Sequence, residues 1–129
     1  MYRKLATAIV VALLSRFDAP AVPSYRPPLD RPVTSGFDES HGPYGAGNRG
    51  LDYAVVPGDG VHAIGSGTVV FAGRVAGALW VTVLHPDGLR SSYGPLATIG
   101  VAAGGAVDVG AVIGTVGSTF HLGVRRRET

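Results

Sequence analysis

The chain has 129 residues, about the length of one domain, and its net charge is +2. Hydrophobic residues make up 46% and charged residues 16%, which is too apolar for a disordered chain. The absence of cysteine excludes a disulfide scaffold, a thiolate zinc site and a cysteine nucleophile. Beyond residue 30, acidic and basic side chains are equal in number. We therefore expect no basic face and no nucleic-acid partner.

The N-terminal segment has the pattern of a secretory signal. Arg3 and Lys4 precede a predominantly apolar run over residues 5–14, which is the charged region and the apolar region of such a signal. The run is too short to span a bilayer, which needs about 20 residues. We expect residues 1–21 to be the signal, the alternative being a short buried helix, and the proline-rich residues 22–30 to be a linker. The protein is then secreted or associated with the cell envelope, and only this signal segment contacts a membrane.

Residues 31–129 are predicted to be all-β. The sequence holds 20 glycines and 9 prolines, which favours short strands joined by tight turns over a helix bundle. Asp87-Gly88 lies between two β-rich runs and predicts a hairpin. The expected strands cover residues 31–37, 51–55, 61–63, 67–72, 78–85, 89–93, 106–107, 111–116 and 120–125.

The spacing of glycines and β-branched residues over 61–73 and 104–114 resembles that of two known β folds. One is the sandwich of biotinyl and lipoyl carrier domains, which carry an acceptor lysine in a hairpin turn. The sole lysine here is Lys4, within the expected signal. A carrier function is therefore disfavoured.

The second fold rests on four motifs in a fixed order. Residues 31–37 resemble an opening strand, and 47–54 (GNRGLDYA) resemble an H-x-G-x-D metal motif. Residues 93–96 (YGPL) stand in the place of Y-x-H-L, and 119–121 (TFH) in the place of H-x-H. This order resembles the lysostaphin/LytM-type zinc metallopeptidases, which cut peptidoglycan cross-bridges. The resemblance implies a LytM-like antiparallel two-sheet groove over residues 31–129, related to the barrel-sandwich hybrid of the carrier domains.

The resemblance also implies a degenerate metal site. It assigns the three zinc-ligand positions to Asn48, Asp52 and His121, and a catalytic zinc needs three protein ligands plus water. Asn48 is a poor ligand, because its neutral amide oxygen is a weak donor beside imidazole. Two further family histidines, which act on water and on the tetrahedral intermediate, are replaced by Pro95 and Thr119. We expect no intact catalytic residue and either no zinc or weakly bound zinc, with Asp52 and His121 hydrogen-bonded to each other or to Asn48 as the alternative.

Three other histidines are weaker candidates. His41 lies in a glycine-rich loop and would become a ligand only if that loop turned inward. His62 is expected to point from a strand into solvent. His85 is expected to begin the predicted hairpin turn, where a polar residue is common.

The aromatic and basic side chains carry two open alternatives. We expect Trp80 and Tyr93 to pack in the core, the alternative being groove aromatics that contact a sugar or a peptide. Residues 125–127 are three consecutive arginines. They are expected to be a solvated end, the alternative being contact with an anionic wall polymer or membrane surface.

The sequence therefore predicts an exported, cell-wall-associated protein without catalytic activity. Its partner is either peptidoglycan, whose peptides would lie in the groove, or a cell-wall hydrolase that it regulates. The alternative is an active zinc metalloendopeptidase that cleaves peptidoglycan cross-links with an unusual ligand set. A third alternative is a truncated or decayed gene product, because the chain stops soon after the H-x-H position.

Overall fold

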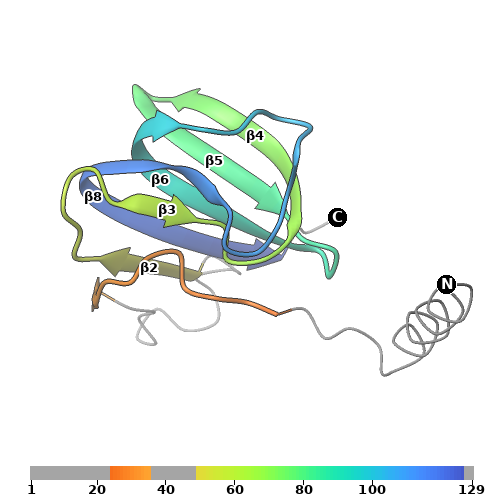
Figure 1. The fold of residues 1–129 in the computed structure, drawn as a ribbon, viewed down its shortest axis with the longest axis horizontal. Coiled ribbons are helices and arrows are strands. Elements are labelled where there is room, and N and C mark those ends of the chain that lie inside the picture. The colour runs from red at the N-terminus through yellow and green to blue at the C-terminus, as the bar shows by residue number, and fades with distance from the viewer. Residues whose placement is uncertain (1–23, 36–48, 127–129) are drawn as a thin grey trace, which may run out of the picture.

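The fold is known from a computed structural model that describes residues 24–35 and 49–126 (Figure 1). All eight strands of these residues pair antiparallel. The described residues form no helix that is long and apolar enough to cross a membrane. The predicted all-β antiparallel class is confirmed. The strands are β1 (Val33–Ser35), β2 (Arg49–Tyr53), β3 (Gly60–His62), β4 (Gly67–Val75), β5 (Ala78–Leu84), β6 (Leu89–Ile99), β7 (Ala106–Val107) and β8 (Val112–Arg126).

Strand β8 joins the two layers of the fold. The strand order is β1-β2-β8-β6-β5-β4-β7, and β3 also pairs with β8. The first part of β8 pairs with β3, its last part pairs with β2, and β6 follows its other edge. Figure 1 shows β8 curling over, so that its two halves lie in different layers. A single long strand therefore pairs with strands of both layers.

The prediction of separate strands over 111–116 and 120–125 is wrong, because β8 runs through both. Its Gly117-Ser118-Thr119 sequence imitates a turn, but pairing with β2 and β6 keeps the chain extended. Strand β6 likewise continues through Pro95, which has no N–H to donate. The ladder tolerates this proline because residues 117–120 of β8 bulge out between the pairs Gly94↔His121 and Leu96↔Val116.

Alternation along the strands separates a core face from a polar face. The register pairs Thr82 with Ser92 and Ser92 with Gly123 across β5, β6 and β8. Since successive side chains point to opposite faces, these three residues lie on the face away from the core. The core residues that are fully enclosed include Val61, Val69, Val81, Val83, Tyr93, Ile113 and Val116.

The predicted hairpin at Asp87-Gly88 is confirmed and joins β5 to β6. The backbone N–H of His85 donates to the carbonyl of Leu89 at 2.8 Å. Gly88 has a φ of 90°, a left-handed conformation that favours glycine. The side chain of Asp87 accepts the N–H of Leu89 at 3.1 Å, which closes the turn.

A buried hydrogen-bond network lies beneath this hairpin. His85 is only 2% exposed, and its Nδ1 donates to the carbonyl of Ser66 at 2.9 Å. Nε2 of His85 then accepts from the Ser91 hydroxyl at 2.7 Å, and Ser91 accepts from Tyr93 at 2.7 Å. The Tyr93 oxygen accepts the N–H of Ile64 at 3.0 Å. His85 therefore begins the hairpin turn, as predicted, and is also an internal link between β-strands.

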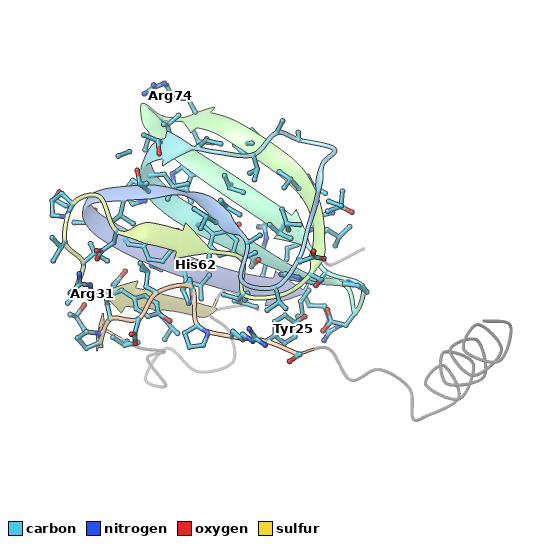
Figure 2. The ribbon with its side chains drawn as sticks, viewed as in Figure 1. Tyr25, Arg31, His62 and Arg74 are labelled. Carbon is cyan, nitrogen blue, oxygen red and sulfur yellow. The ribbon has the colours of Figure 1, made fainter. Side chains whose placement is uncertain are left out.

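Residues 24–31, here called the strap, pack along one side of the domain (Figure 2). Leu29 is 5% exposed and belongs to the core. The N–H of Arg26 donates to the carbonyl of Ile64 at 2.8 Å, and Tyr25 Oη donates to Asp87 Oδ2 at 2.6 Å. This part of the proline-rich segment packs against the domain, and residues 28–31 bend.

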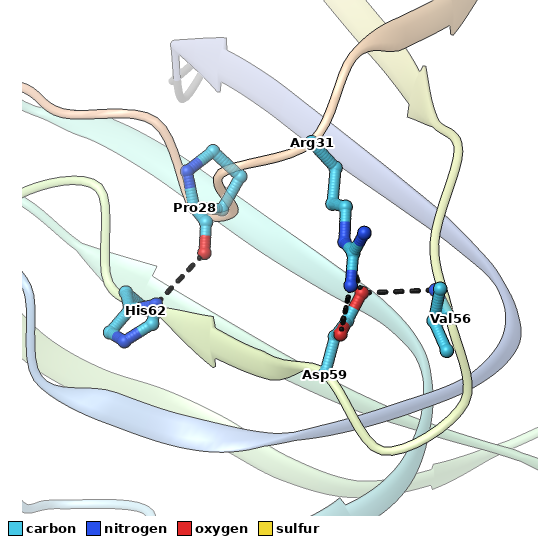
Figure 3. Close-up of polar contacts among 5 residues, drawn as sticks. All are labelled: Pro28, Arg31, Val56, Asp59 and His62. Carbon is cyan, nitrogen blue, oxygen red and sulfur yellow. Dashed lines mark hydrogen bonds and ion pairs between the residues drawn. The ribbon is translucent and has the colours of Figure 1, made fainter.

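The prediction that His62 points from its strand into solvent is wrong. It is half-buried, and its Nδ1 lies 3.2 Å from the carbonyl oxygen of Pro28 in the strap (Figure 3). Its backbone N–H also donates to that oxygen, at 2.9 Å. The strap covers this side of β3, a contact between segments that strand periodicity does not reveal.

The strap ends in an ion pair that should titrate at low pH. Arg31 donates two hydrogen bonds to the Asp59 carboxylate, at 2.8 and 2.9 Å, and the N–H of Val56 donates a third (Figure 3). The Arg31 hydrogen bond, then that of Val56, holds the pKa of Asp59 below 3.8. Because the pKa is depressed in the folded state, this stabilisation is present above the unfolded pKa. It is lost as the pH falls through the folded pKa.

We expect Arg31→Gln to raise the pKa of the Asp59 carboxyl toward its ordinary value. An NMR titration of the side-chain carboxyl carbon measures the shift directly. Arg26→Gln is the matched control, because it removes the same charge from the strap and leaves the bonds to Asp59 in place. An Asp59 midpoint unchanged by Arg31→Gln would contradict the assignment.

Candidate functional site

Asp52 and His121 meet across two neighbouring strands. They are register partners on β2 and β8, although 69 positions separate them in the sequence. Nδ1 of His121 lies 2.8 Å from Oδ1 of Asp52, and the side chains are 41% and 52% exposed. With its proton on Nδ1, the imidazole donates to the carboxylate and leaves Nε2 as an acceptor. The structure therefore brings together these two predicted site residues at the surface.

A glycine makes room for this pair. Gly50 lies two residues before Asp52, on the same face of β2 and opposite Gly123 of β8. A Cβ atom at Gly50 would collide with Cε1 of the His121 ring. A larger residue in place of Gly50 would therefore displace the imidazole of His121 from its position against the β2 backbone.

The bulge in β8 builds a pocket next to the pair. The pocket has a volume of about 560 Å³, and its lining includes Asp52, Pro95, Ser118, Thr119 and His121. Pro95 and Thr119 enter it because residues 117–120 bulge opposite Pro95. Pro95 and Thr119, which stand at the positions of the two family histidines, therefore lie beside Asp52 and His121, whereas Asn48 lies outside the described residues.

The described side chains do not complete a zinc site. Residues 24–35 and 49–126 contain no group of three His, Asp, Glu or Cys side chains placed to hold a metal ion. Asp52 and His121 provide two side chains that can bind a metal ion, and these two side chains are hydrogen-bonded to each other. Three protein ligands plus water are needed for a catalytic zinc. The ligand roles of Asn48, Asp52 and His121 therefore stay predictions.

A second pocket continues the site along β8. It has a volume of about 300 Å³ and is lined by Trp80, Ser92, His121, Gly123 and Arg125. The Trp80 ring lies edge-on to the imidazole of His121, with a centroid distance of 6.5 Å. The two pockets meet at His121 and are together called the groove, here defined by Asp52, Trp80, Pro95, Thr119, His121 and Arg125.

The two aromatic predictions have different outcomes. Tyr93 is fully buried, which confirms its core position. Trp80 is half-buried and lines the groove, so the prediction that it packs in the core is wrong. It precedes the fully buried Val81 on β5 and therefore points to the opposite face. A Cβ atom at Gly94 would collide with the indole, so this glycine seats Trp80 on the groove floor.

The remaining candidates separate into exposed and undescribed residues. Arg125 and Arg126 are exposed, and Nη1 of Arg126 donates to the backbone carbonyl of Asp87 at 3.0 Å. Arg127 and His41 lie outside the described residues. Sequence reasoning missed Ser92 and Gly123, which line the groove. Their positions follow from alternation only when the register of β6 against β8 is known.

Comparison with known proteins relates this chain to one peptidase family. The sequence model of Peptidase family M23 matches residues 46–127. An uncharacterized protein of Mycobacterium tuberculosis is 44% identical over 84 residues, covering 65% of this chain and 33% of that protein. The match thus spans about a third of that relative's length.

Two solved structures show the same likeness in three dimensions. Helicobacter pylori Csd3 superposes with a TM-score of 0.67 at 29% identity, covering 79% of this chain and 30% of that chain. The catalytic domain of the antimicrobial peptidase lysostaphin from Staphylococcus simulans gives a TM-score of 0.59 at 26% identity. That match covers 78% of this chain and 84% of the lysostaphin domain.

Proposed function

The chain belongs to peptidase family M23, a family of zinc metallopeptidases, and from that premise we propose that it binds peptidoglycan peptides without cleaving them. The groove is the binding surface. We propose further that the protein is exported to the cell envelope by its N-terminal segment. That segment lies outside the described residues, so the support for export is the charge and apolar pattern of residues 1–21.

The observation that carries this proposal is the pair Pro95 and Thr119 beside Asp52 and His121. The resemblance to active relatives expects histidines at positions 95 and 119, where they would act on water and on the intermediate. Proline has no side-chain polar atom, and a threonine hydroxyl does not titrate near neutral pH. Proton transfer by a positioned side chain contributes typically about 10²–10⁴ in rate. The chemistry of this groove therefore favours retention of a peptide over hydrolysis.

The groove offers groups that suit an extended peptide. The half-exposed Asp52 carboxylate accepts hydrogen bonds from backbone N–H groups of a peptide, and Nε2 of His121 adds a second acceptor. The Trp80 ring supplies apolar surface along the same face. Aromatic surface beside a few placed polar groups is the usual make-up of a ligand site.

Co-sedimentation of the purified full chain with insoluble peptidoglycan tests the proposal. We expect the chain to sediment and to release no soluble peptide, with or without added zinc. His121→Ala and Asp52→Asn should each lower the affinity for peptidoglycan about tenfold, which is about 1.4 kcal/mol of binding free energy. Asp108→Asn is the matched control, because Asp108 is an exposed carboxylate outside the groove.

Two outcomes would reject the proposal. Peptide release that depends on zinc and stops with a chelator would show an active zinc metalloendopeptidase. A chain that does not sediment with peptidoglycan would instead point to a cell-wall hydrolase as its partner. Circular dichroism of each variant ensures that a loss of binding is not a loss of folding.

A further inference from the structure

Two arginines face each other at the end of the groove. Arg90 of β6 and Arg125 of β8 are direct register partners. The pairs Ser92↔Gly123 and Gly94↔His121 follow at two-residue steps along the same ladder. Because the side-chain period of a strand is two, both arginines lie on the face that carries His121.

This juxtaposition lacks a compensating charge among the described residues. Like charges directly opposite each other on neighbouring strands destabilise a sheet. The β5 partner of Arg90 is Leu84, which offers no acceptor side chain. The ion pairs of the described residues are Arg31 with Asp59 and His121 with Asp52, so neither Arg90 nor Arg125 takes part in one.

Arg90 also has a buried donor without a partner. Its Nε atom is inaccessible to solvent and makes no hydrogen bond within the part of the chain that the structure describes. Buried polar atoms of proteins are almost always hydrogen-bonded, and each exception calls for an explanation. Because Nε is inaccessible to solvent, a ligand in the groove meets only the outer N–H groups of the half-buried Arg90 side chain.

We infer that Arg90 and Arg125 form a subsite for the carboxylate of the bound peptide. A guanidinium binds a carboxylate through paired N–H donors, and a second guanidinium compensates the charge further. Arg125 lines the same pocket as Trp80 and His121, so the subsite is continuous with the groove. This inference rests on the proposed function and names the end of the peptide that the groove selects.

The spacing indicates how long the peptide is. Arg125 lies four residues beyond His121 on β8, which is roughly 13 Å at about 3.3 Å per residue. An extended peptide that places N–H groups beside Asp52 would reach the arginines after about four residues. The ligand is therefore a short peptide of about this length that ends in a free carboxylate.

Calorimetry with a matched pair of peptides tests the subsite. The probes are the tetrapeptide L-Ala-D-Gln-L-Lys-D-Ala, with its terminal carboxylate as the single acidic group, and its C-terminal carboxamide. We expect the full chain to bind the acid about tenfold more tightly than the amide. Arg125→Gln should abolish this difference, and Arg90→Gln should do the same if it folds. Arg74→Gln is the control, because it removes the same charge near the end of β4, away from the groove (Figure 2).

The outcomes separate this inference from the proposed function. Equal affinity for acid and amide would overturn the carboxylate subsite while binding of peptidoglycan peptides stands. No binding of either peptide, together with no sedimentation on peptidoglycan, would overturn both. Stronger binding of a phosphate-containing wall polymer, lost in Arg125→Gln, would overturn the peptide assignment and make the arginines a phosphate site.

Discussion

Asn48→His is expected to raise the zinc affinity of the chain by at least about tenfold. The resemblance to active relatives places residue 48 as the third ligand beside Asp52 and His121, which the structure holds within 2.8 Å of each other. An imidazole would replace a weak amide oxygen and give a His-Asp-His set with an open fourth position. Changes even in groups that only support a metal ligand shift affinity about 10–100-fold. Competition with a chromogenic chelator measures the change.

Two further variants make this test specific. Asn48→Gln keeps a neutral amide and should leave zinc affinity unchanged. Adding His121→Ala to Asn48→His should remove the gain, because the new imidazole would again lack a partner ligand. If Asn48→His does not bind zinc more tightly than the unaltered chain, residue 48 is not a neighbour of the pair, and the metal-site assignment fails.

Restored zinc binding is not expected to restore hydrolysis by itself. Positions 95 and 119 would still lack the donors that stabilise developing charge, a contribution of typically about 10²–10³ in rate for each donor. The triple variant with Asn48→His, Pro95→His and Thr119→His should show measurable release of peptides from peptidoglycan. Release by Asn48→His alone would show that these two positions are dispensable.

Tyr93→Phe is expected to destabilise the fold by about 1–3 kcal/mol. The Tyr93 hydroxyl is fully buried, donates to Ser91 and accepts the N–H of Ile64. Burial raises the pKa of this phenol, so it stays a neutral donor near neutral pH. Phenylalanine fills nearly the same volume but leaves the buried N–H of Ile64 without an acceptor and removes one of the two hydrogen bonds of Ser91. At about 4–8 °C per kcal/mol for a domain of this size, the melting temperature should fall visibly in calorimetry.

An exposed hydroxyl pair provides the contrast for this prediction. Thr98 and Thr115 are 2.8 Å apart on the surface between β6 and β8. Water can replace that bond, so Thr98→Ala should change stability by no more than about 0.5 kcal/mol. Equal losses in Thr98→Ala and Tyr93→Phe would mean that the buried network of His85, Ser91 and Tyr93 contributes nothing beyond an ordinary surface bond.

Local patterns in the sequence were sufficient for the fold class and for part of the site. Alternating apolar residues and glycine-rich turns predicted an antiparallel β fold, because strand periodicity and turn geometry are properties of neighbouring residues. The Asp87-Gly88 hairpin followed from two residues alone. The motif order around Asp52 and His121 identified the two side chains that the structure brings together.

Tertiary structure alone decided the features that depend on register and on contacts between distant segments. Strand β8 runs through two predicted strands, and its bulge opposite Pro95 opens the pocket. No short-range signal in the sequence marks this bulge. Trp80 lines the groove and His85 is buried, because the pairing of β5 with β6 and the packing of the layers fix which side of each strand is covered. Arg90 and Arg125 face each other for the same reason. Such pairings join residues far apart in the chain, and their energies arise only when the sheet is assembled.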